Sequence, residues 1–221
     1  MRKAVIVGGT GGLGSAVVGS LRNDYVFDKK WLSDERPDVM DESAYDHIND
    51  SVDLAIYFAG TNITKPIEEI SSEELDKIFS VNILGAFNFV KNLKNKMLDS
   101  YNPTFIFASS IMVNHPYPNR TAYASTKAAI EGLSNALSIE LGVEGISSVC
   151  LRLGHLNSLM KSTVTNPQLL ESVKSKAPQG NLMDSESIGE IILNIHNFSN
   201  MFNGSVIDLD GGYTKNIWPI G

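Results

Sequence analysis

Cysteine is nearly absent from this 221-residue chain, and long apolar runs are absent altogether. The one cysteine, Cys150, lies in an apolar stretch, so no disulfide can form within the chain and a buried, apolar role is expected. No segment approaches the roughly 20 apolar residues of a membrane span, and the apolar run near the start is too short for a signal peptide. We therefore expect a cytoplasmic protein with no membrane partner.

Basic residues are too few for a nucleic-acid surface. The chain has 18 lysines and arginines against 25 acidic residues, which gives a formal net charge of -7. A surface of this sign repels a phosphate backbone, although a local patch can still hold a single phosphate. Neither nucleic acid nor a metal is an expected partner. The hydrophobic share of 43% is ordinary for a globular domain and is enough to form a core.

Short apolar runs alternate with longer segments of helical period, and no repeat or linker interrupts them. This order predicts βαβ units around a parallel sheet. The predicted strands are Ala4–Val7, one near Tyr25–Trp31, Leu54–Phe58, Thr104–Ala108, Ser147–Leu153 and Ser205–Leu209. The predicted helices are Leu13–Arg22, Ser72–Met97, Ala122–Leu141 and Ser185–Asn197. The expected fold is α/β, a doubly wound, Rossmann-like parallel sheet in a single domain spanning 1–221, with its ligand crevice beyond the carboxyl ends of the strands.

A glycine-rich turn follows the first predicted strand and opens the first helix. Its glycines let the backbone turn tightly and approach a pyrophosphate, whose charge is stabilised at the amide-rich start of a helix. No Gly-Lys-Ser/Thr follows, so ATP chemistry is disfavoured. The position of this turn predicts a dinucleotide site that contains Gly8, Thr10, Gly11, Gly12, Leu13 and Gly14.

A tyrosine and a lysine share one face at the start of a predicted helix. Tyr123 and Lys127 are four residues apart, so the phenol and the ammonium can reach the same ligand. Such a pair is usually just an exposed helix pair, and here its meaning depends on two accompanying residues. Ser110 lies just past the strand Thr104–Ala108, and Asn82 lies in the helix before that strand.

Together these motifs resemble the short-chain dehydrogenase/reductase family over nearly the whole chain. The motifs, in order, are Gly8, Gly12 and Gly14, then Ala59-Gly60, Val81-Asn82-Ile83-Leu84-Gly85, Ser109-Ser110, Tyr123 to Lys127, and Asp210-Gly211-Gly212. The resemblance implies an NAD(P)-dependent oxidoreductase that transfers hydride between its cofactor and a small carbonyl compound or secondary alcohol. It also places Ala59 and Gly60 at the cofactor.

The resemblance implies a role for each residue of the reactive set. Tyr123 would be the acid/base, helped by the Lys127 ammonium, which favours the phenolate. Ser110 would donate to the substrate carbonyl oxygen and stabilise charge as hydride arrives. Lys127 would also hold the nicotinamide ribose, and Asn82 would position a water that relays protons to solvent. Asn82 could instead be an amide bonded to backbone, and Ser110 a hydroxyl that satisfies a turn.

Two segments depart from the family pattern. Gly154, Leu156 and Ser158 would contact the nicotinamide, although Ser158 replaces the usual threonine. His155, between them, is either substrate-facing or a solvated loop residue. Tyr57-Phe58 replaces a pair of asparagines ahead of Ala59-Gly60, which predicts the loss of side-chain bonds that brace the strands.

The cofactor is NAD or NADP, and the sequence leaves both open. Asp38-Val39 matches the family's adenine-contacting pair, but the chain before it is too short for the helix that normally follows the second strand. Asp28 favours NAD if that strand ends early, whereas Lys29 or Lys30 favours NADP if either faces the crevice.

Residues 159–179 are the expected substrate lid, which mixes apolar side chains with lysines. This composition suits a moderately polar substrate with an anionic group, or simply a solvated helix face. Helices Ser72–Met97 and Ala122–Leu141 carry more apolar positions than one sheet face covers, and the tail Tyr213–Gly221 adds more. We therefore expect a homodimer or homotetramer.

Two other functions stay open beside the oxidoreductase. A non-catalytic dinucleotide-binding regulator could keep the fold without turnover, but it would need no phenol beside an ammonium. An epimerase or dehydratase could use the cofactor transiently. A net change in cofactor absorbance during turnover distinguishes an oxidoreductase from both.

Overall fold

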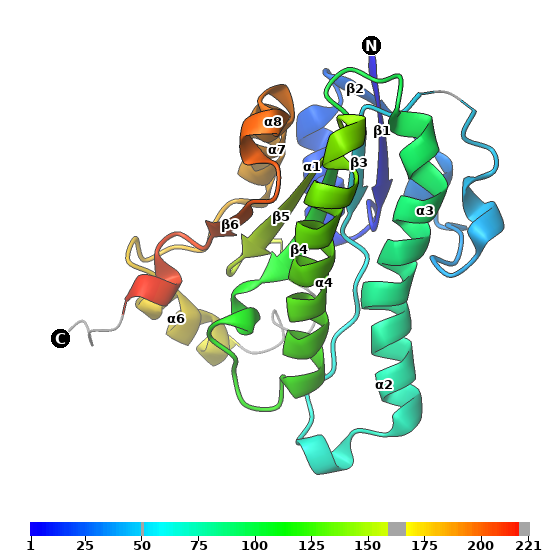
Figure 1. Ribbon diagram of the computed structural model, residues 1–221. Coiled ribbons are helices and arrows are strands. Elements are labelled where there is room, and N and C mark those ends of the chain that lie inside the picture. The colour runs from blue at the N-terminus through cyan, green and yellow to red at the C-terminus, as the bar shows by residue number, and fades with distance from the viewer. Residues whose placement is uncertain (50, 159–166, 217–221) are drawn as a thin grey trace.

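The computed structural model describes residues 1–49, 51–158 and 167–216, and its centre is a parallel sheet (Figure 1). Six strands lie in the order β2-β1-β3-β4-β5-β6, and every neighbouring pair is parallel. The strands are β1 Arg2–Val7, β2 Tyr25–Phe27, β3 Leu54–Tyr57, β4 Thr104–Ser110, β5 Ser147–Leu153 and β6 Val206–Leu209. The chain therefore winds outward from β1 in both directions, as the doubly wound prediction requires.

Helices cover both faces of the sheet (Figure 1). They are α1 Gly12–Leu21, α2 Ser72–Phe79, α3 Gly85–Met97, α4 Thr121–Glu140, α6 Pro167–Lys176, α7 Ser185–Asn197 and α8 Ser199–Phe202. No helix of the described residues is long and apolar enough to cross a membrane.

The two faces of the sheet build two separate cores, because successive side chains of a strand point to opposite faces. In β4, Phe105 and Phe107 pack with α3 and α4, whereas Ile106 packs with α1 and α7. Cys150 is fully buried in the first core, which confirms its apolar role, and burial raises the pKa of its thiol to about 12.

The second strand is shorter than predicted. It ends at Phe27 because the Asp28 carboxylate accepts hydrogen bonds from the amides of Lys30 and Trp31, which starts a 3-10 turn over Lys30–Leu32. The buried Trp31 therefore lies in this turn and not in a strand. The described residues between β2 and β3 form 3-10 turns and no α-helix, as their spacing indicated.

The predicted helix Ser72–Met97 is one helical run with a change of pitch inside it. The five residues Ser80–Leu84, between α2 and α3, form a π-helical turn. Such turns are rare and are frequent at functional sites. The prediction missed α8, which is only four residues long, and treated α6 as part of a lid.

Candidate active site

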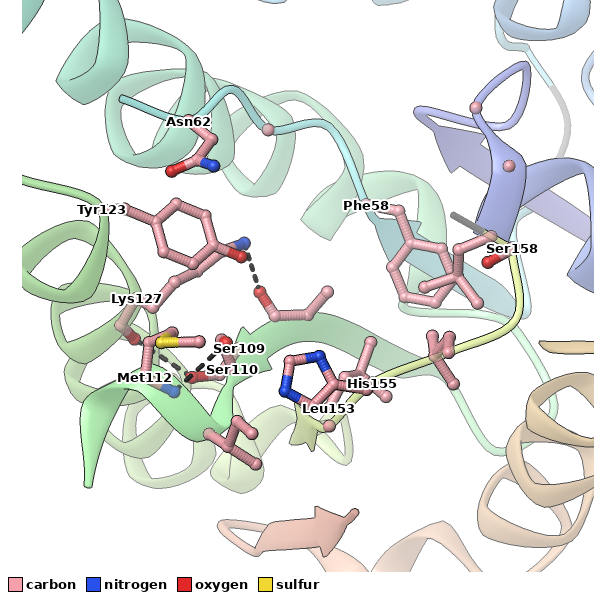
Figure 2. A pocket seen from close by; sticks show the side chains of 18 of the residues that line it. Phe58, Asn62, Ser109, Ser110, Met112, Tyr123, Lys127, Leu153, His155 and Ser158 are labelled. Carbon is pink, nitrogen blue, oxygen red and sulfur yellow. Dashed lines mark hydrogen bonds between the residues drawn. The ribbon is translucent and has the colours of Figure 1, made fainter. Parts of the chain in front are cut away.

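A cavity of about 650 Å³ opens beyond the carboxyl ends of the strands (Figure 2). Its walls come from the turn between β1 and α1, the loop after β3, the ends of β4 and β5, the start of α4, and α6. The predicted site residues that line it are Gly8, Gly11, Gly12, Leu13, Gly14, Gly60, Ser110, Tyr123, Lys127, Gly154, Leu156 and Ser158. The predicted residues outside its lining are Thr10, Asp38, Val39, Ala59 and Asn82.

Tyr123 and Lys127 project from the first turns of α4 into this cavity. The Lys127 ammonium lies 5.7 Å from the centre of the Tyr123 ring and donates to the carbonyl oxygen of Ala108 at 2.8 Å. This bond fixes the buried lysine side chain against the end of β4. The acceptor is neutral, so the ammonium keeps its charge available to the phenol.

Ser110 closes β4 and lies opposite Leu153 in the register of the sheet. Its hydroxyl oxygen accepts from the amide of Met112 at 3.2 Å, so it does satisfy a turn. A hydroxyl also has one hydrogen to donate. Ser110 can therefore hold the turn as an acceptor and still donate into the cavity that it lines.

Asn82 lies in the π-helical turn, with its side chain buried beside the cavity. Its Oδ1 accepts from the amide of Thr61 at 2.8 Å, and its Nδ2 donates to the Thr61 carbonyl and to Thr126 Oγ1. Both hydrogens of the amide are thereby used. The side chain therefore braces the loop after β3 against α4. Because no amide hydrogen is left to donate, a water at Asn82 would have to donate to one of its oxygen atoms.

The glycine turn packs closely against neighbouring backbone. Gly8 has a φ of +92°, and a Cβ there would lie 2.6 Å from the amide nitrogen of Ala59. A Cβ at Gly14 would overlap the carbonyl oxygen of Gly8. Side chains are therefore excluded at both positions, and the turn packs closely against α1 and the loop after β3. Close packing of this kind is typical of the glycines in a dinucleotide-binding turn.

Two cavity residues have buried polar atoms without a partner in the described chain. These atoms are Ser158 Oγ and Asn62 Oδ1. Figure 2 shows Asn62 on the Tyr123 side of the cavity and Ser158 on the opposite side. Buried polar atoms are nearly always hydrogen-bonded, so both positions suit a polar ligand. Asn62 was missed by sequence reasoning because it lies in a loop with no recognisable motif.

His155 is half-buried and does line the cavity, so it is not simply a solvated loop residue. Its Nε2 lies 3.0 Å from the hydroxyl oxygen of Tyr117, which lies 2.7 Å from that of Tyr213. Burial lowers the pKa of His155 and favours its neutral form. These residues follow three different strands, and only the fold brings them together. Sequence reasoning singled out neither tyrosine.

The segments expected at the adenosine are held by local bonds. The Asp38 carboxylate accepts from the amide of Met40, and the carbonyl of Val39 accepts from Asn88 Nδ2, both at 2.9 Å. At the end of β2, the second oxygen of Asp28 lies 2.9 Å from His47 Nε2. This arrangement is compatible with either NAD or NADP.

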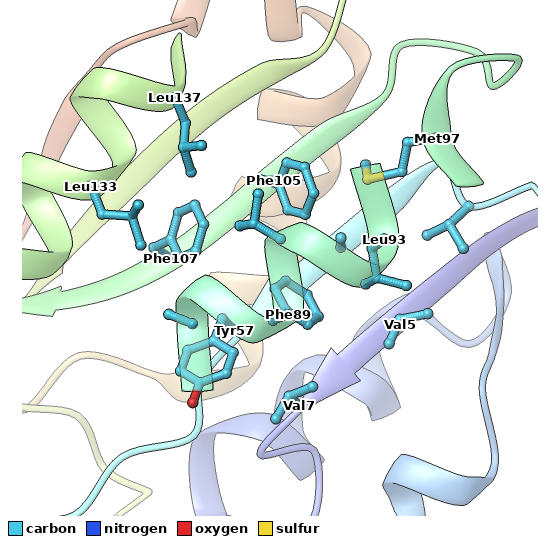
Figure 3. Close-up of a cluster of buried hydrophobic side chains, with 14 of the residues drawn as sticks. Val5, Val7, Tyr57, Phe89, Leu93, Met97, Phe105, Phe107, Leu133 and Leu137 are labelled. Carbon is cyan, nitrogen blue, oxygen red and sulfur yellow. The ribbon is translucent and has the colours of Figure 1, made fainter. Parts of the chain in front are cut away.

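Tyr57 forms a hydrogen bond that braces β3, where the departure from the family pattern predicted a loss of such bonds. The Tyr57 hydroxyl donates to the carbonyl oxygen of Val81 at 2.5 Å. Its ring packs against Phe89 in the first core, and Figure 3 shows the two rings in that cluster. The departure Tyr57-Phe58 therefore does not leave β3 unbraced, which corrects the expectation.

An ion network lies behind the cavity and joins β4, α4, β5 and β6. The Glu131 carboxylate accepts from Ser109 Oγ at 2.6 Å and forms two hydrogen bonds with Arg152, which also pairs with Asp208. Glu131 follows Lys127 by one helical turn. The network thereby fixes α4 relative to the strand ends that carry Ser110.

Comparisons with known proteins agree with this geometry. The sequence profile described as enoyl-(acyl carrier protein) reductase matches residues 34–214. The chain belongs to the short-chain dehydrogenase/reductase family. Membership confirms the fold class and the enzyme class that the sequence implied, an NAD(P)-dependent oxidoreductase.

Relatives in the short-chain dehydrogenase/reductase family include a tropinone reductase homologue of Arabidopsis thaliana, 26% identical over 97% of this chain and 93% of that protein. Carbonyl reductase [NADPH] 2 of Sus scrofa is 27% identical over 73% of this chain and 68% of its own length. A short chain dehydrogenase family protein from Francisella tularensis has the same fold, with a TM-score of 0.82, 21% identity and coverage of 97% and 99% of the two chains.

Proposed function

We propose that Tyr123 exchanges a proton with the substrate oxygen of a small ketone, aldehyde or secondary alcohol. The observation that carries the proposal is that Tyr123, Lys127 and Ser110 line one cavity with the glycine turn. The bound NAD or NADP would supply or accept the hydride. In reduction, the Tyr123 hydroxyl donates its proton to the oxygen of the former carbonyl group, and the Lys127 ammonium stabilises the phenolate that remains.

Ser110 would donate its hydroxyl hydrogen to the same substrate oxygen. The hydroxyl oxygen of Ser110 already accepts a hydrogen bond from the Met112 amide, and this bond orients the hydroxyl hydrogen. A donor placed before the reaction stabilises developing charge without reorganisation during the reaction. Ser110 and Tyr123 together would therefore hold the substrate oxygen at one point of the cavity.

The cofactor contacts proposed here follow from the cavity walls. Gly8, Gly11, Gly12, Leu13 and Gly14 would receive the pyrophosphate, and Lys127 the nicotinamide ribose. Ser158, Leu156 and Gly154 would meet the carboxamide, since Ser158 Oγ is buried without a partner in the described chain. Asp38, Val39, Ala59, Gly60 and Thr10 complete the proposed set at the adenosine and along the turn, and Asn82 acts as a positioning residue.

The structure describes one part of the proposed lid, the helix α6. Leu170 and Val173 of α6 line the cavity, so this helix covers the site. The lid residues 159–166, among them Met160, Lys161 and Val164, lie outside the described residues. A substrate of the carbonyl class agrees with the names of the relatives, which include a carbonyl reductase and a 3-oxoacyl-[acyl-carrier-protein] reductase from Thermotoga maritima.

We also propose a homodimer or homotetramer formed through α3 and α4. Ile139 of α4 is 78% exposed and the following Val143 is 87% exposed, while Leu84 and Phe87 expose about half of their surface at the start of α3. Exposed apolar side chains on both helices support an interface there. The tail residues Ile217, Trp218 and Ile220 lie outside the described residues.

A cytoplasmic location stays a prediction.

The test begins with thermal-shift titration of NAD and NADP, followed by a panel of ketones and aldehydes with the reduced form that binds. Stoichiometric loss of reduced-cofactor absorbance supports the oxidoreductase. Turnover without net loss would indicate the epimerase or dehydratase, and binding without turnover of any compound would indicate the regulator.

A further inference from the structure

The cavity is positively charged at its walls, although the chain as a whole is acidic. Its lining contains Arg120 and Lys127 and, among the described residues, neither aspartate nor glutamate. The net charge of the chain is -7, so carboxylates are common elsewhere on the molecule. A cavity that contains cations and lacks carboxylates favours an anionic ligand.

Lys127 and Arg120 are held differently. The Lys127 ammonium is buried and donates to the carbonyl of Ala108, which ties it to the end of β4. Arg120 is the N-cap residue of α4, three residues before Tyr123, and is half-buried. It forms no ion pair or side-chain hydrogen bond with any residue in the part of the chain that the structure describes. A guanidinium that lines a cavity and has no side-chain partner among the described residues can bind a ligand.

Arg120 precedes Tyr123 by three residues, at the start of α4, and lines the same cavity. Along α4 the order is Arg120, Tyr123, Lys127, and the Lys127 ammonium donates to the carbonyl oxygen of Ala108, so the lysine end of this row lies against β4. The glycine turn, which is proposed above to receive the pyrophosphate, follows β1 and is not part of α4. This assignment leaves Arg120 to bind a group of the substrate.

The neighbouring loop is also polar. The amide of Lys65 donates to the carbonyl of Asn119 at 3.2 Å, which holds the loop after β3 against the residue that precedes Arg120. This loop carries Asn62, whose buried Oδ1 has no partner in the described chain, and Thr64, which also lines the cavity. Other residues that line the cavity are apolar, among them Ile111, Met112, Leu153, Leu170 and Val173. The cavity thus suits a ligand with an apolar body and one charged end.

We propose that Arg120 binds a carboxylate of the substrate, so that the preferred substrates are oxo acids and the corresponding hydroxy acids. The inference rests on the function proposed above and adds the substrate class. A guanidinium offers two parallel N–H donors that match a carboxylate, which also fixes the orientation of the bound molecule. Binding the carboxylate at Arg120 would present the oxo group one helical turn away, at Tyr123.

The test compares straight-chain oxo acids of increasing length with their methyl esters, which keep the carbonyl but lack the charge. The measured quantity is the acid-to-ester ratio of kcat/KM, followed by oxidation of the reduced cofactor. We expect the acid to be preferred at one chain length, and the ratio to fall by about 10- to 100-fold in Arg120→Gln, the scale of a hydrogen bond to a charged group. Arg120→Lys should keep part of the preference.

Arg22→Gln is the matched control, because Arg22 is an exposed arginine at the C-cap of α1 and does not line the cavity. It should leave the acid-to-ester ratio as in the wild type. Equal use of acids and esters by the wild type, or an unchanged ratio in Arg120→Gln, would overturn the assignment of Arg120 while the oxidoreductase stands.

A binding measurement separates this proposal from the chemistry. Calorimetry on Tyr123→Phe protein saturated with reduced cofactor should show tighter binding of the oxo acid than of its ester, and loss of that difference when Arg120→Gln is added. This result together with no reduction of any carbonyl compound by the wild type would support the carboxylate site and reject the proposed reaction. Equal binding of acid and ester would reject the carboxylate site.

Discussion

The hydroxyl of Tyr57 at the end of β3 donates a hydrogen bond to the carbonyl oxygen of Val81, the residue before Asn82. The bond ends in the π-helical turn, where the altered pitch changes which backbone carbonyls are used within the helix. A core residue of the sheet is thereby joined to the turn that positions Asn82. Because Asn82 braces the loop after β3 against α4, Tyr57 indirectly supports the reactive face of α4.

Tyr57→Phe should destabilise the protein by about 1 kcal/mol, because it removes the donor and leaves the ring packing intact. Tyr45→Phe is the matched control, since the buried Tyr45 hydroxyl has no partner in the described chain. Urea unfolding monitored by circular dichroism measures both. Equal stability loss in the two variants would show that the Val81 bond contributes nothing specific.

The sequence alone predicted a helix or strand correctly wherever its apolar pattern was continuous over the whole element. Ser147–Leu153 and Ser185–Asn197 were predicted with the bounds that the structure has, because continuous apolar strands and capped amphipathic helices are clear signals. The π-helical turn was not predictable, since a single shifted hydrogen bond hardly alters the apolar period. The early end of β2 depends on the side chain of Asp28 capping the next turn, which strand propensity does not record.

The site was predictable only where its residues belong to motifs. Ser110, Tyr123 and Lys127 lie together in one cavity, as the resemblance implied. Asn62 and Arg120 also line it, but they lie in loops and at a helix start whose contacts arise from distant segments. Residues without a motif become recognisable only when the fold shows what surrounds them.

Gly12→Val should sharply weaken cofactor binding while the protein stays folded. A Cβ at Gly12 would lie 3.1 Å from the carbonyl oxygen of Ser158, so the larger side chain would fill the gap between the turn and the segment that is proposed to contact the nicotinamide. Gly19→Val in the same helix is the control, because nothing lies within 4 Å of a Cβ there. Calorimetric titration with NAD and NADP decides the matter, and unchanged affinity in folded Gly12→Val would place the phosphate site elsewhere.

Ile139→Asp should shift the protein towards monomers if α4 forms the subunit interface. The carboxylate would be buried without a partner in the interface, which is unfavourable. Val26→Asp is the control, because Val26 is exposed on the edge strand β2. Light scattering of the wild type at micromolar concentration should give a multiple of 24.1 kDa. A monomeric wild type would contradict the proposed assembly.

Ser110→Ala and Lys127→Met should separate chemistry from cofactor binding. Ser110→Ala removes a donor to the substrate oxygen, so turnover should fall by about 100-fold or more while cofactor affinity stays nearly unchanged. Lys127→Met removes a charge that serves both the phenol and the ribose, so turnover and cofactor affinity should fall together. Steady-state kinetics combined with cofactor titration would contradict these roles if the two variants behaved alike.

The most direct test of the proposed mechanism is the turnover number of Tyr123→Phe on a verified substrate. The substitution keeps the ring on α4 and deletes the hydroxyl that is proposed to exchange the proton. We predict a fall in kcat of about 10²- to 10⁴-fold, the usual contribution of general acid/base catalysis, with cofactor affinity close to that of the wild type. Full activity in Tyr123→Phe would show that the proton donor is another group and would contradict the mechanism.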